Sequence, residues 1–370
     1  MLSIKYHIPY TKNLQKKADK IINKISSMQE NILSILLNKT NEMKYNDLQF
    51  KFLGQGDECI VYQVGNFAIK IYVAEHNKDV DILKMLKELY NKHIAINTVI
   101  LYGNIVIHKH LIVVVNVANG TLDNWVKNII SKKDNNIDEK WLIMLIQILY
   151  GMYVLQKELK LYHADLTHRN ILYVQLDKFI KINYSIGKYK FSIITDIIFI
   201  ISDFGKSQSM LLSDNKLSNS VIQEYINNNK DFEFLSGLYN KNIVDYMYKF
   251  YTYDELLKIV KDDMNINAYI TSLEEKLEEK GKRIKKPKWY NEVQIRRSLC
   301  YYILEHNYLD INTIPNINTE LFLPSVDIKN IIETLKDSNS IISKIQKCHK
   351  LLLNYDNTKI KIYKTLNINV

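Results

Sequence analysis

The stretch HADLTHRN at residues 163–170 places an aspartate and an asparagine, Asp165 and Asn170, in a short polar loop that follows a long apolar segment. At this spacing both side chains can face one site. A carboxylate can accept the proton of an attacking hydroxyl, and an amide oxygen can bind Mg²⁺. These are the two tasks that phosphoryl transfer asks of such a loop.

Two further charged residues, Asp203 and Lys70, lie at the ends of apolar runs that are typical of strands. Asp203, in SDFG, follows IIFIIS, and a carboxylate at a strand end is well placed to bind a metal that bridges phosphates. Lys70 ends FAIK, where an ammonium can be held against phosphate oxygens. A lone lysine on a strand is more often simply exposed to solvent.

The segment LGQGDECIV at residues 53–61 places Gly54 and Gly56 between two expected strands, the second of which contains Val61. Glycines without side chains would let backbone amides approach phosphates. Taken alone, two glycines in a hairpin also fit a plain turn. The order of glycine turn, strand lysine, polar loop and metal aspartate makes a purely structural interpretation much weaker.

The elements that must position these residues follow from hydrophobic periodicity. Residues 48–73 alternate with period two and predict three antiparallel strands. A helix is expected over 78–92, and two apolar runs on either side of Lys109 and His110 predict two more strands. The first lobe is therefore expected to be a five-stranded sheet with one helix.

The remaining segments are expected to be mainly helical. Apolar residues at three- and four-residue steps predict an amphipathic helix over 11–38, and further helices are expected over 125–130 and 141–159. A second strand pair around Gly187 and Lys188 interrupts this half, beyond which the chain is expected to stay mainly helical to its end.

Composition bounds the class of protein. Of the 370 residues, 47% are hydrophobic and 24% charged, which argues against a largely disordered chain. The net charge of +10 favours anionic partners without identifying one. Three widely spaced cysteines form neither a disulfide framework nor a zinc pattern, which indicates a reducing compartment. No segment approaches the roughly 18 apolar residues that a membrane span requires. A cytoplasmic protein is therefore expected.

In the order and spacing of these motifs, the chain resembles a eukaryotic-type protein kinase over about residues 48–260. The resemblance implies an α+β, bilobal fold, with a small antiparallel N-lobe over 48–118 and a mainly helical C-lobe over 119–370. A helical extension would occupy residues 1–47. The C-lobe would carry a hairpin insertion at about 176–198 and a helical extension from about 265.

The resemblance also implies ATP and Mg²⁺ as cofactors and a protein as substrate. The nucleotide would contact the glycine turn, the lysine strand and the hinge, through Gly54, Gly56, Val61, Lys70, Val117 and Ala118. Asp165 would be the catalytic base, assisted by Lys70. Asn170 and Asp203 would hold Mg²⁺. Asp231 would anchor the catalytic loop, and Asp79, with Glu75 as the alternative, would pair with Lys70.

The departures from the family pattern leave several questions open. Ala164 replaces the arginine that usually receives an activating phosphate, so switching by phosphorylation is not expected. No APE tripeptide follows Asp203. Thr167 stands where serine/threonine kinases usually carry a phosphate-contacting lysine, and Arg169 is similar to an arginine of receptor tyrosine kinases. The long insertion resembles haspin-like kinases and the kinases of large DNA viruses, which suggests a viral origin.

Three functions remain open at this stage. The first is a protein kinase, with serine or threonine as acceptor. The second is a small-molecule phosphotransferase of the aminoglycoside or choline kinase type, which also uses an HxDxxxxN loop. The third is a pseudokinase or scaffold, motivated by Ala164 and the missing APE. A nucleic-acid partner has no support beyond the basic run at 280–288, and the oligomeric state is open.

Overall fold

A computed structural model of the chain divides into two compact units, Met1–Leu235 with Ile331–Val370, and Ser236–Asn330. The residues that the structure describes all lie in the first unit. They are 12–56, 58–75, 77–122, 124–125, 137–232, 335, 340–355, 360–361 and 364–369. The helix expected over 125–130 and the basic run at 280–288 lie outside them, wholly or almost wholly.

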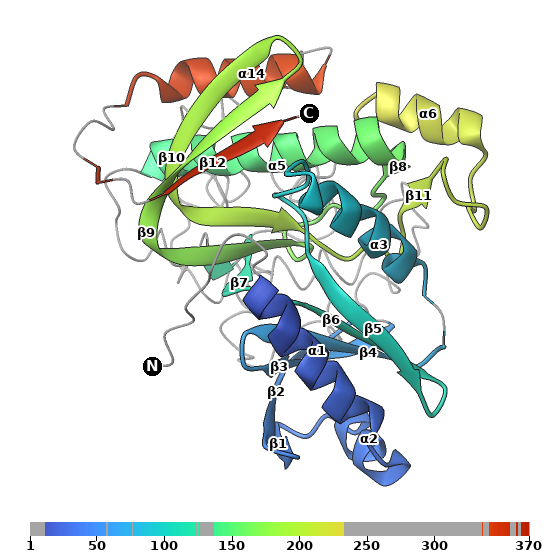
Figure 1. The fold of residues 1–370 in the computed structure, drawn as a ribbon. Coiled ribbons are helices and arrows are strands. Elements are labelled where there is room, and N and C mark those ends of the chain that lie inside the picture. The colour runs from blue at the N-terminus through green and yellow to red at the C-terminus, as the bar shows by residue number, and fades with distance from the viewer. Residues whose placement is uncertain are drawn as a thin grey trace, which may run out of the picture. The chain divides into compact units, whose positions relative to one another are not determined.

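The first half of the described chain is built on a six-stranded antiparallel sheet (Figure 1). The sheet has the order β1-β2-β3-β4-β6-β5, one strand more than expected. The strands are β1 (Glu42–Tyr45), β2 (Leu48–Gln55), β3 (Cys59–Val64), β4 (Phe67–Tyr72), β5 (Leu101–Ile107) and β6 (His110–Asn116). The added strand, β1, pairs with β2 at the sheet edge.

Two helices, α1 (Lys12–Ser26) and α2 (Glu30–Leu37), pack on this sheet in place of the one expected over 11–38 (Figure 1). Their apolar residues share one core with alternate strand residues such as Phe67 and Ile69 of β4. The side chains of Ala68 and Lys70 point to the opposite face, because successive strand residues alternate. One face of the sheet is therefore closed by helices, and the other carries Lys70.

Helix α3 (Lys78–Asn91) begins as the sequence predicts, after the N-cap Asn77, whose side chain accepts a hydrogen bond from Asp79 N at 2.8 Å. Its buried residues recur at helical spacing, with Val80, Leu83 and Leu86 among them. The helix packs near β5. Its first turn meets β4 through the ion pair between Asp79 and Lys70.

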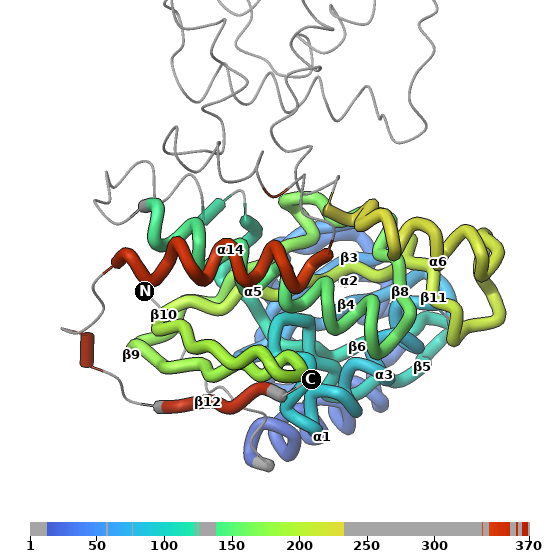
Figure 2. The backbone as a smooth tube through the Cα atoms, turned by 90° about the horizontal axis from the view of Figure 1, so that it is seen from above, coloured from blue at the N-terminus to red at the C-terminus, as the bar shows by residue number. Residues whose placement is uncertain are grey.

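The second half of the described chain is organised around α5 (Ile137–Leu159), in which every residue from Trp141 to Met152 is buried. A helix that is apolar on all sides has to be surrounded by other elements. Here α14 (Ile341–Leu352) and the hairpin strand β10 (Tyr189–Ile201) pack against it, as Figures 1 and 2 both show. Helix α6 (Asn219–Asn227) lies near the short strands β8 (Leu161–Tyr162) and β11 (Gln208–Ser209), which pair with each other.

The inserted hairpin is longer than the predicted 176–198. Strands β9 (Ile171–Ile186) and β10 (Tyr189–Ile201) pair on both sides of an irregularity between Thr195 and Ile197, and they are joined by a turn at Gly187 and Lys188, where a turn was predicted. The short strand β7 (Gly120–Thr121) pairs with the start of β9. Strand β12 (Lys364–Asn369) pairs in parallel with residues 180–185 of β9. The expectation of a helical end is therefore wrong for β12.

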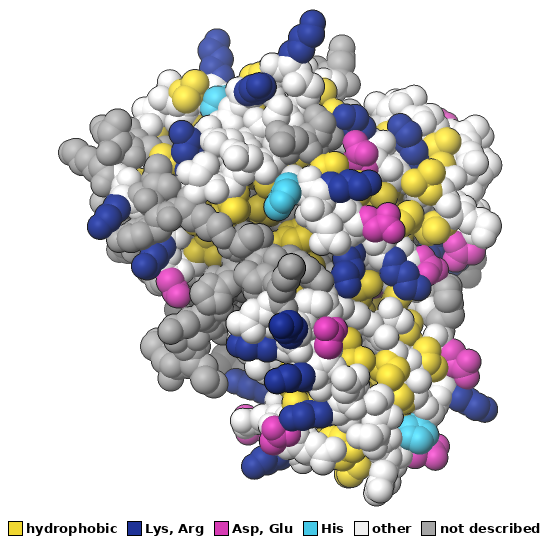
Figure 3. All heavy atoms as spheres, viewed as in Figure 1, with side chains coloured by type: hydrophobic (Ala, Val, Ile, Leu, Met, Phe, Trp, Pro, Cys, Tyr) yellow, Lys and Arg dark blue, Asp and Glu magenta, His cyan; other side chains and the backbone are white. Residues whose placement is uncertain are grey.

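One helix in the described residues, Asp138–Leu159, is long and apolar enough by composition to cross a membrane. The sequence-based expectation that no segment approaches a membrane span is wrong in this respect. Of the 18-residue stretch of this helix that meets the criterion, 78% is buried inside the protein, as is also common for the core helix of a soluble fold. On the face drawn in Figure 3, lysine and arginine side chains are spread among acidic and apolar ones.

We predict that His349 makes the attachment of α14 to the hairpin sensitive to pH. Its Nδ1 lies 2.9 Å from the Tyr189 hydroxyl, its ring packs on Phe191, and burial lowers its pKa below the ordinary value. Since the unfolded chain then takes up the proton first, stability falls as the pH drops through the unfolded pKa. The melting temperature of His349→Gln should therefore change less between pH 8 and pH 5 than that of the wild type.

Equal slopes for the two proteins across this pH range would contradict the prediction. His93→Gln provides the matched control, because His93 is exposed in the turn after α3. Its melting temperature should follow the wild-type pH dependence.

Candidate active site

The glycine turn and the strand lysine lie next to each other in one row across the sheet. Gly54 pairs with Val61, Val61 with Lys70, and Lys70 with Val113. Paired residues of neighbouring strands point to the same face. The hydrogen bond from Gly56 N to Cys59 O, 2.9 Å long, closes the turn between β2 and β3. This arrangement brings together Gly54, Gly56, Val61 and Lys70 as the sequence predicted.

Lys70 forms an ion pair with Asp79, the first acidic residue of α3, at 2.8 Å between Nζ and Oδ2. Side-chain exposure is 12% for Lys70 and 1% for Asp79. Glu75, the alternative for this pairing, is exposed, and so is Glu88 further along α3. Asp79 is therefore the residue that meets Lys70.

The Asp79 carboxylate accepts two further hydrogen bonds. One comes from the Tyr72 hydroxyl, and the other from Phe204 N at 3.0 Å. Burial by itself would raise the pKa of Asp79, but the Lys70 ammonium and these donors lower it below its ordinary value. Burial would likewise lower the pKa of Lys70, and the Asp79 carboxylate raises it well above the ordinary value. Both groups are charged at neutral pH.

The polar loop is held from below by Asp231. This carboxylate, 3% exposed, accepts hydrogen bonds from His163 N at 2.9 Å and Ala164 N at 3.0 Å. Ala164 has a φ of 66°, a left-handed conformation that costs a residue with a Cβ about 1–2 kcal/mol. Asp231 therefore lies where the sequence comparison placed the loop anchor, and it stabilises this strained turn.

Asp165 and Asn170 face each other within the loop. Asn170 Nδ2 donates to Asp165 O at 2.8 Å and lies 3.4 Å from Asp165 Oδ2. Because Nδ2 is used inside the loop, Oδ1 is the amide atom that remains as a metal ligand. Asp165 is half-buried, so its carboxylate can still reach an incoming group.

The β9–β10 hairpin brings Asn170 and Asp203 to one end of the same strand pair. Ile171 pairs with Ile201, Asn170 precedes that pair and Asp203 follows it two residues later. Ser202 donates to Asn170 O from both its amide, at 2.8 Å, and its hydroxyl, at 3.0 Å. Asp203 lies 33 positions after Asn170, and one hairpin spans the interval between these two predicted metal ligands.

The end of β10 is fixed by two buried amides. Gln147 of α5 accepts from Phe199 N and donates to Ile197 O, both at 3.0 Å, and Asn97 donates to Phe199 O at 2.8 Å. A Cβ on Gly151 of α5 would lie 2.9 Å from Ile201 Cδ1. The same Cβ would lie 3.1 Å from Asn97 O, so a larger residue would press on the backbone next to the strand that leads to Asp203.

Asp203 itself has a φ of 66°, and its side chain is exposed on one side. The protein packed around it raises its pKa above the ordinary value, and the Lys70 ammonium counteracts this effect. A bound cation would favour the ionised form. His163, fully buried between the loop and this segment, lies 3.1 Å from Ser202 O through Nε2 and packs on the Phe204 ring.

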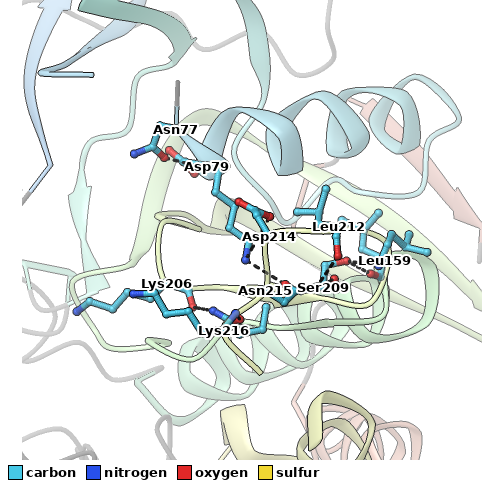
Figure 4. Close-up of polar contacts among 12 residues, drawn as sticks. Asn77, Asp79, Leu159, Lys206, Ser209, Leu212, Asp214, Asn215 and Lys216 are labelled. Carbon is cyan, nitrogen blue, oxygen red and sulfur yellow. Dashed lines mark hydrogen bonds and ion pairs between the residues drawn. The ribbon is translucent and has the colours of Figure 1, made fainter. Parts of the chain in front are cut away.

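The segment after Asp203 is held by its own polar side chains (Figure 4). Asn215 accepts a hydrogen bond from Ser209 N at 3.0 Å and donates to Leu212 O at 2.7 Å. Lys78, at the start of α3, donates to Asn215 Oδ1 at 3.0 Å. Gln208 and Ser209 form β11, which pairs with β8 (Leu161–Tyr162) just before the polar loop. The loop and the segment are thus one assembly.

The residues present fit a nucleotide and a magnesium ion. No protein atom lies within 4 Å of a Cβ built on Gly54, so open space adjoins the turn there. No three His, Cys, Asp or Glu side chains gather as a metal site among the described residues. Asp203 and Asn170 would therefore supply two oxygen ligands. Mg²⁺ commonly takes its remaining ligands from phosphates and water.

The remaining predicted contacts lie in the segment after β6. Val117 is buried and Ala118 half-buried, and Asn119 N donates to Tyr173 O of β9 at 2.8 Å. The segment thus joins the sheet to the hairpin.

Sequence reasoning missed Lys206, whose Nζ lies 3.0 Å from Asp165 Oδ2. Its place directly after DFG was the available signal.

Comparison with protein families gives one match, to protein tyrosine and serine/threonine kinase, over residues 62–227. A search of curated proteins finds no match. The matched range is somewhat less than half of the chain and contains Lys70, Asp165, Asn170 and Asp203. This part of the chain is therefore similar to protein kinases, and the fold is the bilobal α+β fold of that class.

We predict that Asp79→Asn lowers the free energy of unfolding by about 3 kcal/mol, because the buried Lys70 ammonium loses its counter-charge. Urea denaturation monitored by circular dichroism would measure the difference. Asp81→Asn is the matched control, since Asp81 lies in the same first turn and is less buried. Equal losses for the two variants would show that the effect belongs to the helix terminus and not to the ion pair.

Proposed function

We propose that the protein is a Mg²⁺-dependent protein kinase that transfers the γ-phosphoryl group of ATP to a protein hydroxyl, that of serine or threonine. The observation that supports this most directly is the shared location of Asp165, Asn170 and Asp203, with the Lys70–Asp79 pair bonded to Phe204 next to Asp203. The fold class and the family match support kinase activity in general.

The proposed roles follow from the geometry. Lys70, held by Asp79, would bind phosphate oxygens below the glycine turn, and Val117 and Ala118 would border the adenine. Asp165 would orient the acceptor hydroxyl and take its proton as the oxygen attacks phosphorus. Asn170 and Asp203 would hold Mg²⁺, which neutralises charge on the phosphates.

Two alternatives are kept as outcomes of the test. A pseudokinase would bind Mg-ATP without transfer, and a small-molecule phosphotransferase would phosphorylate an alcohol but no protein. The described chain retains every residue that the proposed chemistry requires. A viral origin and a cytoplasmic location remain proposals, based on the long hairpin insertion and on the cysteine content.

We predict that Asp165→Asn lowers transfer from γ-labelled ATP to generic acceptor proteins by at least about 100-fold, because the hydroxyl loses its base. Nucleotide affinity should stay close to that of the wild type. Identification of the labelled residue type would distinguish serine and threonine from tyrosine.

Asp203→Asn should abolish transfer and also weaken Mg-nucleotide binding, because a metal ligand is lost. Asp196→Asn, on the same hairpin but away from the loop, is the control and should retain activity. Full activity of Asp203→Asn would rule out the assignment. Binding of Mg-ATP by the wild type without transfer to any protein would favour one of the two alternatives.

A further inference from the structure

Lys206 is the cation paired with Asp165 among the ion pairs of the described residues. Its Nζ lies 3.0 Å from Asp165 Oδ2, and the side chains are 59% and 26% exposed. The roles proposed above do not use Lys206. A lysine beside the carboxylate that would receive the acceptor proton is within reach of the group being transferred.

The backbone around Lys206 is fixed, although its side chain is exposed. Gln208 Nε2 donates to Lys206 O at 3.0 Å. The neighbouring Ser207 is buried and donates from N to Phe204 O at 3.0 Å and from Oγ to His163 O at 3.1 Å. In Figure 4 the Lys206 side chain extends away from the cluster around Ser209 and Asn215. The backbone of Lys206 is thus held in place, and its long side chain reaches Asp165.

Stability does not account for the ion pair. Exposed pairs between lysine and a carboxylate contribute little to stability, because water screens them and both side chains lose freedom. Such a pair can be exchanged for a stronger one. A terminal phosphate carries more charge than a carboxylate and forms charge-assisted hydrogen bonds with an ammonium.

The other groups around Asp165 leave this task unfilled. Lys70 is buried and bound to Asp79 on the sheet side of the site. Thr167, whose N donates to Asp165 O at 2.8 Å, carries a neutral hydroxyl at the position where the resemblance to serine/threonine kinases would place a lysine. Among the described residues, the cation that reaches Asp165 from another segment is Lys206.

We propose that Lys206 binds the γ-phosphate of ATP, with its Nζ moving from Asp165 to the phosphate when nucleotide enters. The proposal rests on the proposed function in taking ATP as the ligand. During transfer, the acceptor oxygen bonds to the γ-phosphorus as the bond to the β,γ-bridging oxygen breaks and ADP leaves. The hydroxyl proton goes to Asp165, and Lys206 stays protonated and neutralises charge on the moving group.

A γ-phosphate contact predicts a difference between two nucleotides. Calorimetric titration with Mg²⁺ would compare ADP and a non-hydrolysable ATP analogue on the full chain. Lys206→Met should weaken analogue binding about tenfold, which corresponds to about 1.4 kcal/mol, and leave ADP binding within about twofold. Lys206→Arg should bind the analogue nearly as the wild type does, because it keeps the charge.

Lys216→Met, an exposed lysine of the same segment, is the matched control and should bind both nucleotides as the wild type does. Adding Thr167→Lys to Lys206→Met is expected to restore analogue affinity by supplying a cation from the loop. Equal weakening of ADP and analogue, or no weakening of either in Lys206→Met, would overturn the proposal.

The same titrations separate this inference from the proposed function. A wild-type protein that binds both nucleotides and transfers no phosphate overturns the kinase function, while the Lys206 contact is still decided by the affinity difference. A wild-type protein that binds neither nucleotide overturns both.

Discussion

The Asp79 carboxylate is the contact on which the arrangement of the site depends. It is 1% exposed and would be costly to bury alone, yet it meets the Lys70 ammonium, the Tyr72 hydroxyl and the Phe204 amide. These donors come from β4 and from the segment that carries Asp203, while Asp79 belongs to α3. One buried charge thus connects three elements, and a shift of any of them would remove a hydrogen bond from it.

The same device holds the polar loop. Asp231, also buried, binds the amides of His163 and Ala164, and burial raises its pKa. Asp231 accepts a hydrogen bond from the amide of Ala164, which has a left-handed conformation. Asp79 accepts one from the amide of Phe204, which follows the left-handed residue Asp203. Such conformations persist where the surroundings over-determine them. The orientation of the chemical groups is therefore maintained by buried carboxylates at some distance from the proposed reaction.

The residues of the site could be predicted where local sequence determines their role, and the rest depended on distant contacts. Lys70, Asp165, Asn170 and Asp203 come from short motifs on recognisable strands and loops. The choice between Asp79 and Glu75 depended on which carboxylate reaches Lys70, and this contact between α3 and β4 is not encoded in the local sequence. β12 was missed because its pairing with β9 joins residues far apart in the sequence, and a short polar strand carries little periodicity. The catalytic roles of Lys70, Asp165, Asn170 and Asp203 remain predictions.

The segment between Asp203 and α6 differs most from the family pattern, and its packing explains how it stays ordered. Ala164, at the position of the missing arginine, lies against the apolar cluster of Tyr162, Ile222 and Ile226, where α6 meets the loop. Asn215 supplies hydrogen bonds to the segment from within, and Lys78 of α3 joins it there. An internal amide and a lysine thus connect α3 to this segment without an added phosphate. The expectation, drawn from Ala164, that the segment is not switched by phosphorylation stays a prediction.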